Sequence, residues 1–308
     1  MTKLCRLLPL TVLLLVGCST DEHGDDGQVP VSLTAYVGIE QTRVGTAVQG
    51  SQFEEGETFN VYFPENVLPQ TTTYTTTDAV GSVQAAVQPF FNGHKTTTAT
   101  AHAYYPQTVT HETTSFTVAK DQTNDEAYKA SDLMYATASL VKNGSAATGT
   151  LVFQHKMAKV IVDVTADNSI SAITGVRIIS GYRTIAATTP LTCTLSTASA
   201  GLSDAITATD NGGNDYACVK MYENATGTTH VQCAALLPPQ TIAAGDFIEV
   251  RTPEGTATYA LDAAKALANG NTYTVKLAVM YGSIDVTSTI TNWTEGGPIT
   301  VRLRPQTN

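Results

Sequence analysis

Short stretches in which every second residue is apolar recur along this chain, and they limit the folds it can adopt more than any other feature. The clearest covers residues 31–39, whose odd positions are Val31, Leu33, Ala35, Val37 and Ile39. A two-residue period puts such side chains on one face of a β-strand. Similar stretches follow along the chain, separated by Gly, Asn, Asp and Pro. Many short strands at this spacing predict an all-β protein built from antiparallel β-sandwiches.

Two segments have a different composition. Residues 262–268 read Asp-Ala-Ala-Lys-Ala-Leu-Ala and are followed by Asn269-Gly270, which predicts one short helix with Asp262 as its N-cap. Residues 71–77 are all Thr except Tyr74. We expect a solvated loop or an edge strand there, rather than a flexible or glycosylated patch, because Thr favours strands.

The charge balance excludes one broad class of partner. Only 14% of residues are charged, and 27 acidic against 17 basic residues give a net charge of -10. Nucleic acid is not expected as a partner, because binding its phosphate backbone requires clustered Lys and Arg. The strand pattern breaks near residues 154–157, and the halves on either side have normal domain sizes. We therefore predict an N-terminal domain over residues 31–155 and a C-terminal domain over residues 156–308.

The first residues are typical of an export signal. Two basic residues precede an apolar run that is too short to span a membrane and ends in Leu-Val-Gly-Cys, a sequence that resembles a bacterial lipobox. We expect residues 1–17 to be removed and Cys18 to be lipidated, with residues 18–30 as an acidic tether. An ordinary secretory signal with an incidental Cys is the alternative.

Three cysteines remain beyond the signal and the lipidation site, namely Cys193, Cys218 and Cys233. An odd number in an oxidising compartment allows one disulfide and one free thiol, and the sequence does not choose among the three pairings. Their spacing does not predict a structural zinc site.

No familiar catalytic motif occurs in the sequence, so we expect no enzymatic activity and no cofactor. His155 beside an apolar strand is expected to pack or to form hydrogen bonds. The acidic and amide residues between 204 and 215 have the oxygen ligands that calcium prefers, but they lack EF-hand spacing, so a polar loop is expected and no metal site. An exported hydrolase whose carboxylates meet only in the folded chain is the enzymatic alternative.

Four further segments occur in order along the mature chain. They are ASDLMYA at residues 130–136, LVFQHKMAKVIV at 151–162, NGNTYTVKL at 269–277 and ITNW at 290–293. Behind a lipobox, this ordered set resembles the fimbrillin family of Bacteroidales, the lipoprotein pilins related to the major and minor fimbrial subunits.

The resemblance implies two tandem transthyretin-like β-sandwich domains and a structural role in a surface filament. It also implies that a trypsin-like or arginine-specific protease removes the first strand outside the outer membrane, after which a strand of the next subunit fills the vacated groove. The family's cut follows an Arg just after that strand, and Arg43-Val44 occupies this place. The removable leader would then be residues 31–43, and the partners would be other pilin subunits, the protease and, before cleavage, the outer membrane.

The C-terminal tail has the pattern that a replacement strand needs. Ile299, Val301 and Leu303 alternate with polar residues, and Gly296-Gly297-Pro298 supplies a hinge before them. We predict that residues 298–308 form the donor strand, the alternative being the last strand of their own domain. Other roles remain open: a tip adhesin, an anchor subunit, or a monomeric surface lipoprotein that binds a glycan or a host protein.

Overall fold

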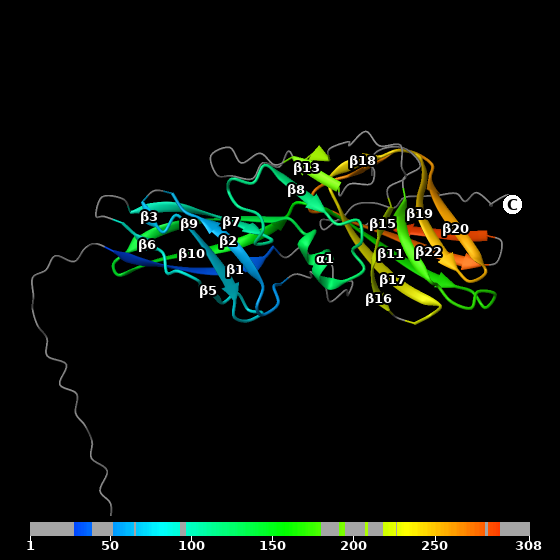
Figure 1. Cartoon of the computed structure of the whole chain (residues 1–308), viewed down its shortest axis with the longest axis horizontal. Coiled ribbons are helices and arrows are strands. Elements are labelled where there is room, and N and C mark those ends of the chain that lie inside the picture. Colours follow the sequence, from blue (N-terminus) through cyan, green and yellow to red (C-terminus); the bar gives the residue numbers. More distant parts are fainter. Residues whose placement is uncertain are drawn as a thin grey trace, which may run out of the picture.

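The computed structural model describes residues 28–38, 52–64, 66–92, 97–179, 191–194, 207–208, 218–225, 227–280 and 283–289. These residues form several β-sheets and one short helix, arranged along one long axis (Figure 1). Strands β1 to β7, β9 and β10 lie at one end, strands β11, β12, β15 to β17, β19, β20 and β22 lie at the other, and α1 and β8 lie between them. The all-β class predicted from the sequence is confirmed.

The sheet at the first end contains nine strands among the described residues. Their order is β3 (Val67–Leu68), β6 (Phe90–Phe91), β1 (Val29–Val37), β10 (Ala146–His155), β9 (Met134–Asn143), β7 (Thr98–Tyr105), β2 (Thr58–Tyr62), β4 (Thr71–Thr76) and β5 (Val83–Ala85).

The remaining strands form smaller sheets. One has the order β16 (Tyr222–Ala225), β17 (His230–Leu237), β11 (Ala158–Ala166), β22 (Thr272–Met280) and β23 (Ser283–Thr289), and another has β15 (Cys218–Lys220), β12 (Gly175–Ile179), β19 (Gly245–Thr252) and β20 (Gly255–Leu261). A three-stranded sheet joins β14 (Thr207–Ala208), β13 (Leu191–Thr194) and β8 (Ser115–Val118), and β18 (Gln240–Ile242) pairs with β21 (Lys265–Leu267).

Two strand pairs are parallel, in a structure whose other named pairs are antiparallel. β1 runs parallel to β10, and β11 runs parallel to β22. Parallel neighbours cannot be joined by a tight turn, so each pair brings together segments that are far apart in the sequence. The periodicity of a strand does not encode this choice of direction.

Buried hydrophobic side chains form two clusters. The first core consists of residues between Val29 and Phe153 in the sequence, most of which lie on strands of the nine-stranded sheet. The second core includes β11, β17 and β22 and extends to Val279. The chain passes from one core to the other at residues 155–158, between β10 and β11.

Part of the first half of the chain packs on the second core. Six buried residues of this part belong to that core: Tyr104, Val109, Phe116, Val118, Tyr128 and Leu133. β8 pairs with β13, and the Gln122 side chain both donates to the carbonyl of Leu236 and accepts from its N–H, each at 2.8 Å. These contacts fasten the segment around α1 (Asp125–Ala130) to the second core.

The helix predicted over residues 262–268 is wrong. That segment contains β21 instead, which pairs with β18 and buries Leu267. A helix of seven residues is marginal in water, so strand pairing and burial outweigh its Ala content. The observed helix is α1, which has Asn124 as its N-cap, two acidic residues in its first turn and Lys129 in its last.

The threonine-rich run forms a paired strand, β4. It lies between β2 and β5, so it is neither a loop nor an edge strand. Thr72 and Thr76 are buried together with Tyr74. Both threonine hydroxyls have a hydrogen-bond partner, which is what allows such side chains to be buried.

Candidate functional site

Strand β1 lies within the nine-stranded sheet, and its side chains alternate strictly between the core and solvent. Val31, Leu33, Ala35 and Val37 are at most 7% exposed, whereas Ser32, Thr34 and Tyr36 point outward and are exposed. The apolar face of this strand therefore forms part of the first core.

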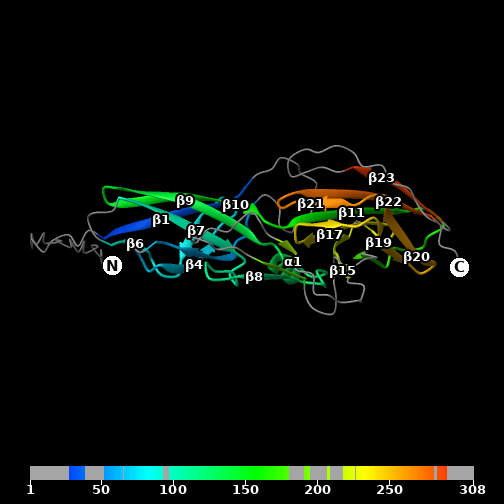
Figure 2. The same cartoon turned by 90° about the horizontal axis from the view of Figure 1, so that it is seen from above.

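β1 has partners on both edges. On one edge it pairs with β10 over seven consecutive positions, from Val31 opposite Ala147 to Val37 opposite Phe153. On the other edge it pairs with β6, and two of its N–H groups donate to the carbonyls of Pro89 and Gly81 at 2.9 and 3.0 Å. Figure 2 shows β1 between β10 and β6. Removal of this strand would leave backbone groups unpaired on both sides of the gap.

The core beneath β1 is shaped around individual side chains. A Cβ atom added to Gly149 would lie 2.6 Å from Leu140 Cδ2 and 3.2 Å from Leu33 Cδ2. The absent side chain at Gly149 thus leaves room for Leu33. At the other end of the strand, Val37 pairs with Phe153 of β10, whose ring packs edge-on against Phe53 and Phe59, with centroids 5.2 and 5.0 Å apart.

The residue that follows β1, Gly38, and the later residue Phe53 both contact Phe153. The N–H of Gly38 donates to the carbonyl of Phe153 at 2.7 Å, and Phe53, which is 3% exposed, packs on the ring of Phe153. Residues 39–52, which include Arg43, therefore connect two residues that both contact Phe153.

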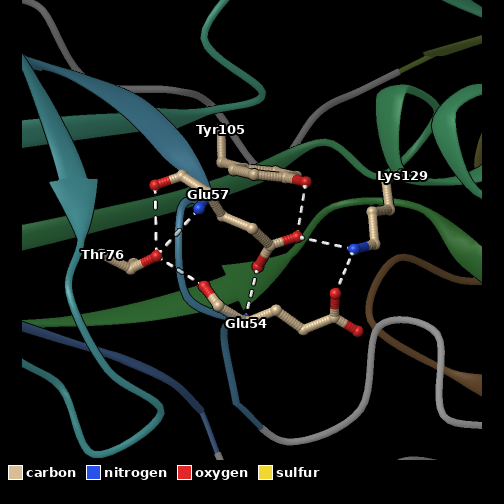
Figure 3. Close-up of polar contacts among 5 residues, drawn as sticks. All are labelled: Glu54, Glu57, Thr76, Tyr105 and Lys129. Carbon is tan, nitrogen blue, oxygen red and sulfur yellow. Dashed lines mark hydrogen bonds and ion pairs between the residues drawn. The ribbon is translucent and has the colours of Figure 1, made fainter.

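The segment after Phe53 is fixed by a polar cluster (Figure 3). The Thr76 hydroxyl accepts from the N–H of Glu57 at 2.9 Å and donates to the carbonyl of Glu54 at 2.5 Å. One carboxylate oxygen of Glu57 accepts from the N–H of Glu54 at 2.9 Å, and the other accepts from the Tyr105 hydroxyl at 3.3 Å. These bonds hold residues 54–57 against β4 and β7.

Lys129 completes this cluster from α1. Its ammonium group lies 2.6 Å from Glu54 Oε2 and 3.5 Å from Glu57 Oε1. The two carboxylates raise the pKa of Lys129 against the lowering effect of burial. Because α1 is packed on the second core through Tyr128, this ion pair links the two cores next to the chain that follows Phe53.

Where the chain passes between the cores, charged side chains are buried. His155 Nδ1 lies 2.9 Å from Asp132 Oδ1, and both side chains are almost inaccessible. His155 thus forms a hydrogen bond inside the protein, as the sequence predicts. Lys159 is also buried, and burial lowers its pKa to about 8 although Asp132 acts in the opposite direction.

The depressed pKa of Lys159 predicts how stability depends on pH. Between pH 8 and 10.5 the unfolded chain binds more protons at this site than the folded one, so the free energy of unfolding should rise with pH. We expect an increase of roughly 2 kcal/mol between pH 7 and pH 10 at this site. Lys159→Met should remove that part of the increase in urea titrations. Lys276→Met, at an exposed position of β22, should leave it unchanged, and an equal rise in Lys159→Met would contradict the assignment.

Several residues for which the sequence predicts a role in lipidation, cleavage or strand exchange lie outside the described residues. They are Cys18, Ile39, Arg43, Val44, Ile299, Val301 and Leu303, and the possible calcium ligands between 204 and 215 lie outside them too. Cys233 is described, and it is a buried free thiol whose pKa burial raises to about 12. Phe53, Glu57 and Lys129 were not predicted as functional residues from the sequence. The lone aromatic residue before three closely spaced glutamates was a weak signal, since the partners of Glu54 and Glu57 come from distant strands and a helix.

The described ranges contain neither a candidate membrane span nor a candidate metal site. No helix in them has the length and apolarity that crossing a bilayer requires. Nor do three or more His, Cys, Asp or Glu side chains gather there in an arrangement that could hold a metal ion.

Comparison with known sequences identifies one family. The sequence model described as fimbrillin-like matches residues 42–293. Among curated proteins, no sequence matches.

Three solved structures with the same fold are proteins of Bacteroides species. A candidate cell adhesion protein of Bacteroides uniformis has a TM-score of 0.61 and 20% identity over 88% of this chain and 100% of its own. One from Bacteroides ovatus has a TM-score of 0.58 and 17% identity over 85% and 95%. One from Bacteroides fragilis has a TM-score of 0.50 and 11% identity over 87% and 99%. At these identities the likeness shows the fold.

Proposed function

This chain belongs to the fimbrillin-like family, and from that premise we propose that it is a structural subunit of a cell-surface fimbria that polymerises by donor-strand exchange. In this proposal β1 is a leader strand that proteolysis releases, and residues 298–308 of another copy take its place. The observation that carries the proposal is that β1 closes the first core between two edges.

The placement of β1 explains how its release would drive association. Each of its larger apolar side chains contributes about 1.5–3 kcal/mol when fully buried, so a groove without them is strongly unfavourable in water. An extended segment with a two-residue apolar period restores both the burial and the backbone hydrogen bonds. The tail carries that pattern in Ile299, Val301 and Leu303.

We propose that a protease frees the leader by cutting after Arg43. Residues 39–52 join two residues, Gly38 and Phe53, that both contact Phe153, and they are mostly small or polar in sequence. Such segments are the usual sites of proteolytic cleavage. Downstream of the cut, Phe53 and the polar cluster around Glu57 would keep the new N-terminal segment in place.

Brief treatment with limiting trypsin tests this cut. We expect the fastest cleavage of the purified precursor to follow Arg43, because the described part of the next segment is anchored from Phe53 onward. Intact mass measurement should show loss of the residues up to Arg43, and Arg43→Gln should slow this cleavage by at least about tenfold, since trypsin requires a basic residue at the cut. A first cut elsewhere, or equal cleavage of Arg43→Gln, would argue against this processing site.

The remaining parts of the proposal concern export and domain organisation. We propose that residues 1–17 direct export and that lipid on Cys18 tethers the precursor to the outer membrane through residues 18–30, until cleavage releases it into the fimbria. We also propose domains over residues 31–155 and 156–308, which the two separate cores support. The segment around α1 would then be a strap of the first domain packed on the second.

A further inference from the structure

The two edges of β1 are paired to different extents. On one edge the strand pairs with β10 at seven consecutive positions. On the other edge it meets residues 80–91, and we call this contact the seam. There β6 pairs only with Val29 and Pro30, and Thr34 forms a single antiparallel bridge with Ser82. Because its strand pairing is shorter, the seam is the edge at which β1 should open first.

Hydrogen bonds cross the seam at separate places. The N–H of Val31 donates to the carbonyl of Pro89 at 2.9 Å, and the N–H of Ala35 donates to the carbonyl of Gly81 at 3.0 Å. The side-chain amide of Gln88 donates to the carbonyl of Val31 at 2.7 Å, although Gln88 itself is exposed. Hydrogen bonds that water can reach add little to stability, because water competes for the same groups. The seam therefore needs a cover to hold β1 firmly.

One outward side chain of β1 supplies such a cover. The ring of Tyr36 lies against Gly81, since a Cβ atom added to Gly81 would lie 2.5 Å from both Cε1 and Cζ of this ring. Gly81 is buried, although its neighbours Val80 and Ser82 are both exposed. The ring thus covers Gly81 next to the hydrogen bond that Gly81 accepts from Ala35.

The flat site under the ring belongs to the turn before β5. Gly81 has a φ of +98°, a conformation that residues with a side chain rarely adopt, and a side chain there would also take the place of the ring. Asp78 fixes the turn, because one of its carboxylate oxygens accepts from the N–H groups of Val80 and Ser82, each at 2.9 Å. The site is therefore held by contacts of its own segment.

We propose that Tyr36 and Gly81 form a lock on the leader: the ring seated on Gly81 keeps β1 in its groove after cleavage and so sets how readily another strand replaces it. The inference rests on the proposed function and names a specificity determinant of the same groove. A strand with an aromatic side chain at this outward position is held longer than one with a small side chain. Because Tyr36 is 44% exposed, only about half of its possible burial is gained, which corresponds to roughly a fivefold longer lifetime.

Amide hydrogen exchange in the uncut precursor tests the contact independently of the proposed function. The N–H of Ala35 exchanges only when its bond to Gly81 opens. Tyr36→Ala should speed this exchange roughly fivefold, whereas Tyr36→Phe keeps the ring and should stay within about twofold of the wild type. Val141→Ala is the matched control, because it removes an exposed apolar side chain from the same face of the sheet, on β9, and it should have no effect.

Release of the leader after cleavage tests the lock itself. After brief treatment with limiting trypsin, size-exclusion chromatography under native conditions separates the free leader, and its mass identifies it. Release from Tyr36→Ala should be roughly fivefold faster than from the wild type, and its ladder of oligomers should appear sooner. A synthetic peptide of residues 28–38 should delay the wild-type ladder. The same peptide with Tyr36→Ala should need a roughly fivefold higher concentration for an equal delay.

The outcomes separate the lock from the proposed function. Unchanged exchange and release in Tyr36→Ala would overturn the lock, even where ladders form normally. Gly81→Ala should speed exchange more in the wild type than in Tyr36→Ala, because only the wild type has a ring for the new Cβ to displace. Equal effects in both would show that the glycine serves the turn alone and would also overturn the lock. Absence of a ladder from every protein, with exchange as expected, would instead refute the proposed function and leave Tyr36 as a contact of the precursor.

Discussion

Leu303→Asp is expected to abolish polymerisation of the cleaved subunit and to leave the precursor folded. In the proposed filament this side chain enters the groove that β1 vacates, where the leader residues are at most 7% exposed. An aspartate there would place an uncompensated charge in the first core of the acceptor, which costs several kcal/mol. For the measurement, residues 40–46 are replaced by the recognition sequence of a sequence-specific protease, and we call this protein the cleavable precursor. After its cleavage, gel electrophoresis without boiling should show monomer for Leu303→Asp where the wild type shows a ladder.

Thr300→Asp is the matched control for this experiment. It adds the same charge to the same tail, but alternation places residue 300 on the outer face, so the ladder should persist. Circular dichroism and urea titration of both precursors should match the wild type. A normal ladder from Leu303→Asp would show that the tail does not fill the groove. Loss of the ladder in both variants would mean that any charge in the tail interferes, and the inward position of Leu303 would be refuted.

The strands themselves follow from local sequence, because period and side-chain type act over a few residues. β7 spans Thr98–Tyr105, where Ala99, Ala101 and Ala103 alternate with Thr or His and lie inward. β1 shows the same agreement at Val31 to Val37, since each apolar position lies inward. The place of β1 beside β10, in contrast, depends on contacts between residues more than a hundred positions apart. Periodicity contains no information on such pairing.

The wrong helix prediction and the missed polar cluster have the same cause, namely contacts between residues far apart in the sequence. The Ala-rich segment around Lys265 favours a helix locally, but its pairing with β18 and the burial of Leu267 decide its structure. Likewise, nothing near Glu57 in the sequence indicates that Lys129 will reach it from a helix packed on the other core. In a short segment, burial against a large apolar surface outweighs the local propensity for helix or strand.

The second prediction concerns the stability of the uncleaved precursor, because the first core depends on the apolar face of β1. Leu33 is 7% exposed and lies over Gly149, whose missing side chain makes room for it. Leu33→Asp should lower the free energy of unfolding by roughly 4 kcal/mol, through loss of apolar burial and the cost of a buried carboxylate. Urea titration of the uncleaved protein measures this change.

Ser32→Asp tests whether the effect comes from the inward position or from charge on the strand. Its side chain is exposed on the opposite face of β1, so its effect should stay within about 0.5 kcal/mol. The weakened leader of Leu33→Asp should also leave the groove faster after cleavage, so ladders of the cleavable precursor should appear sooner. If both variants lose the same small stability, β1 does not hold the first core closed, and its removal would expose too little apolar surface to drive a neighbouring strand into its place.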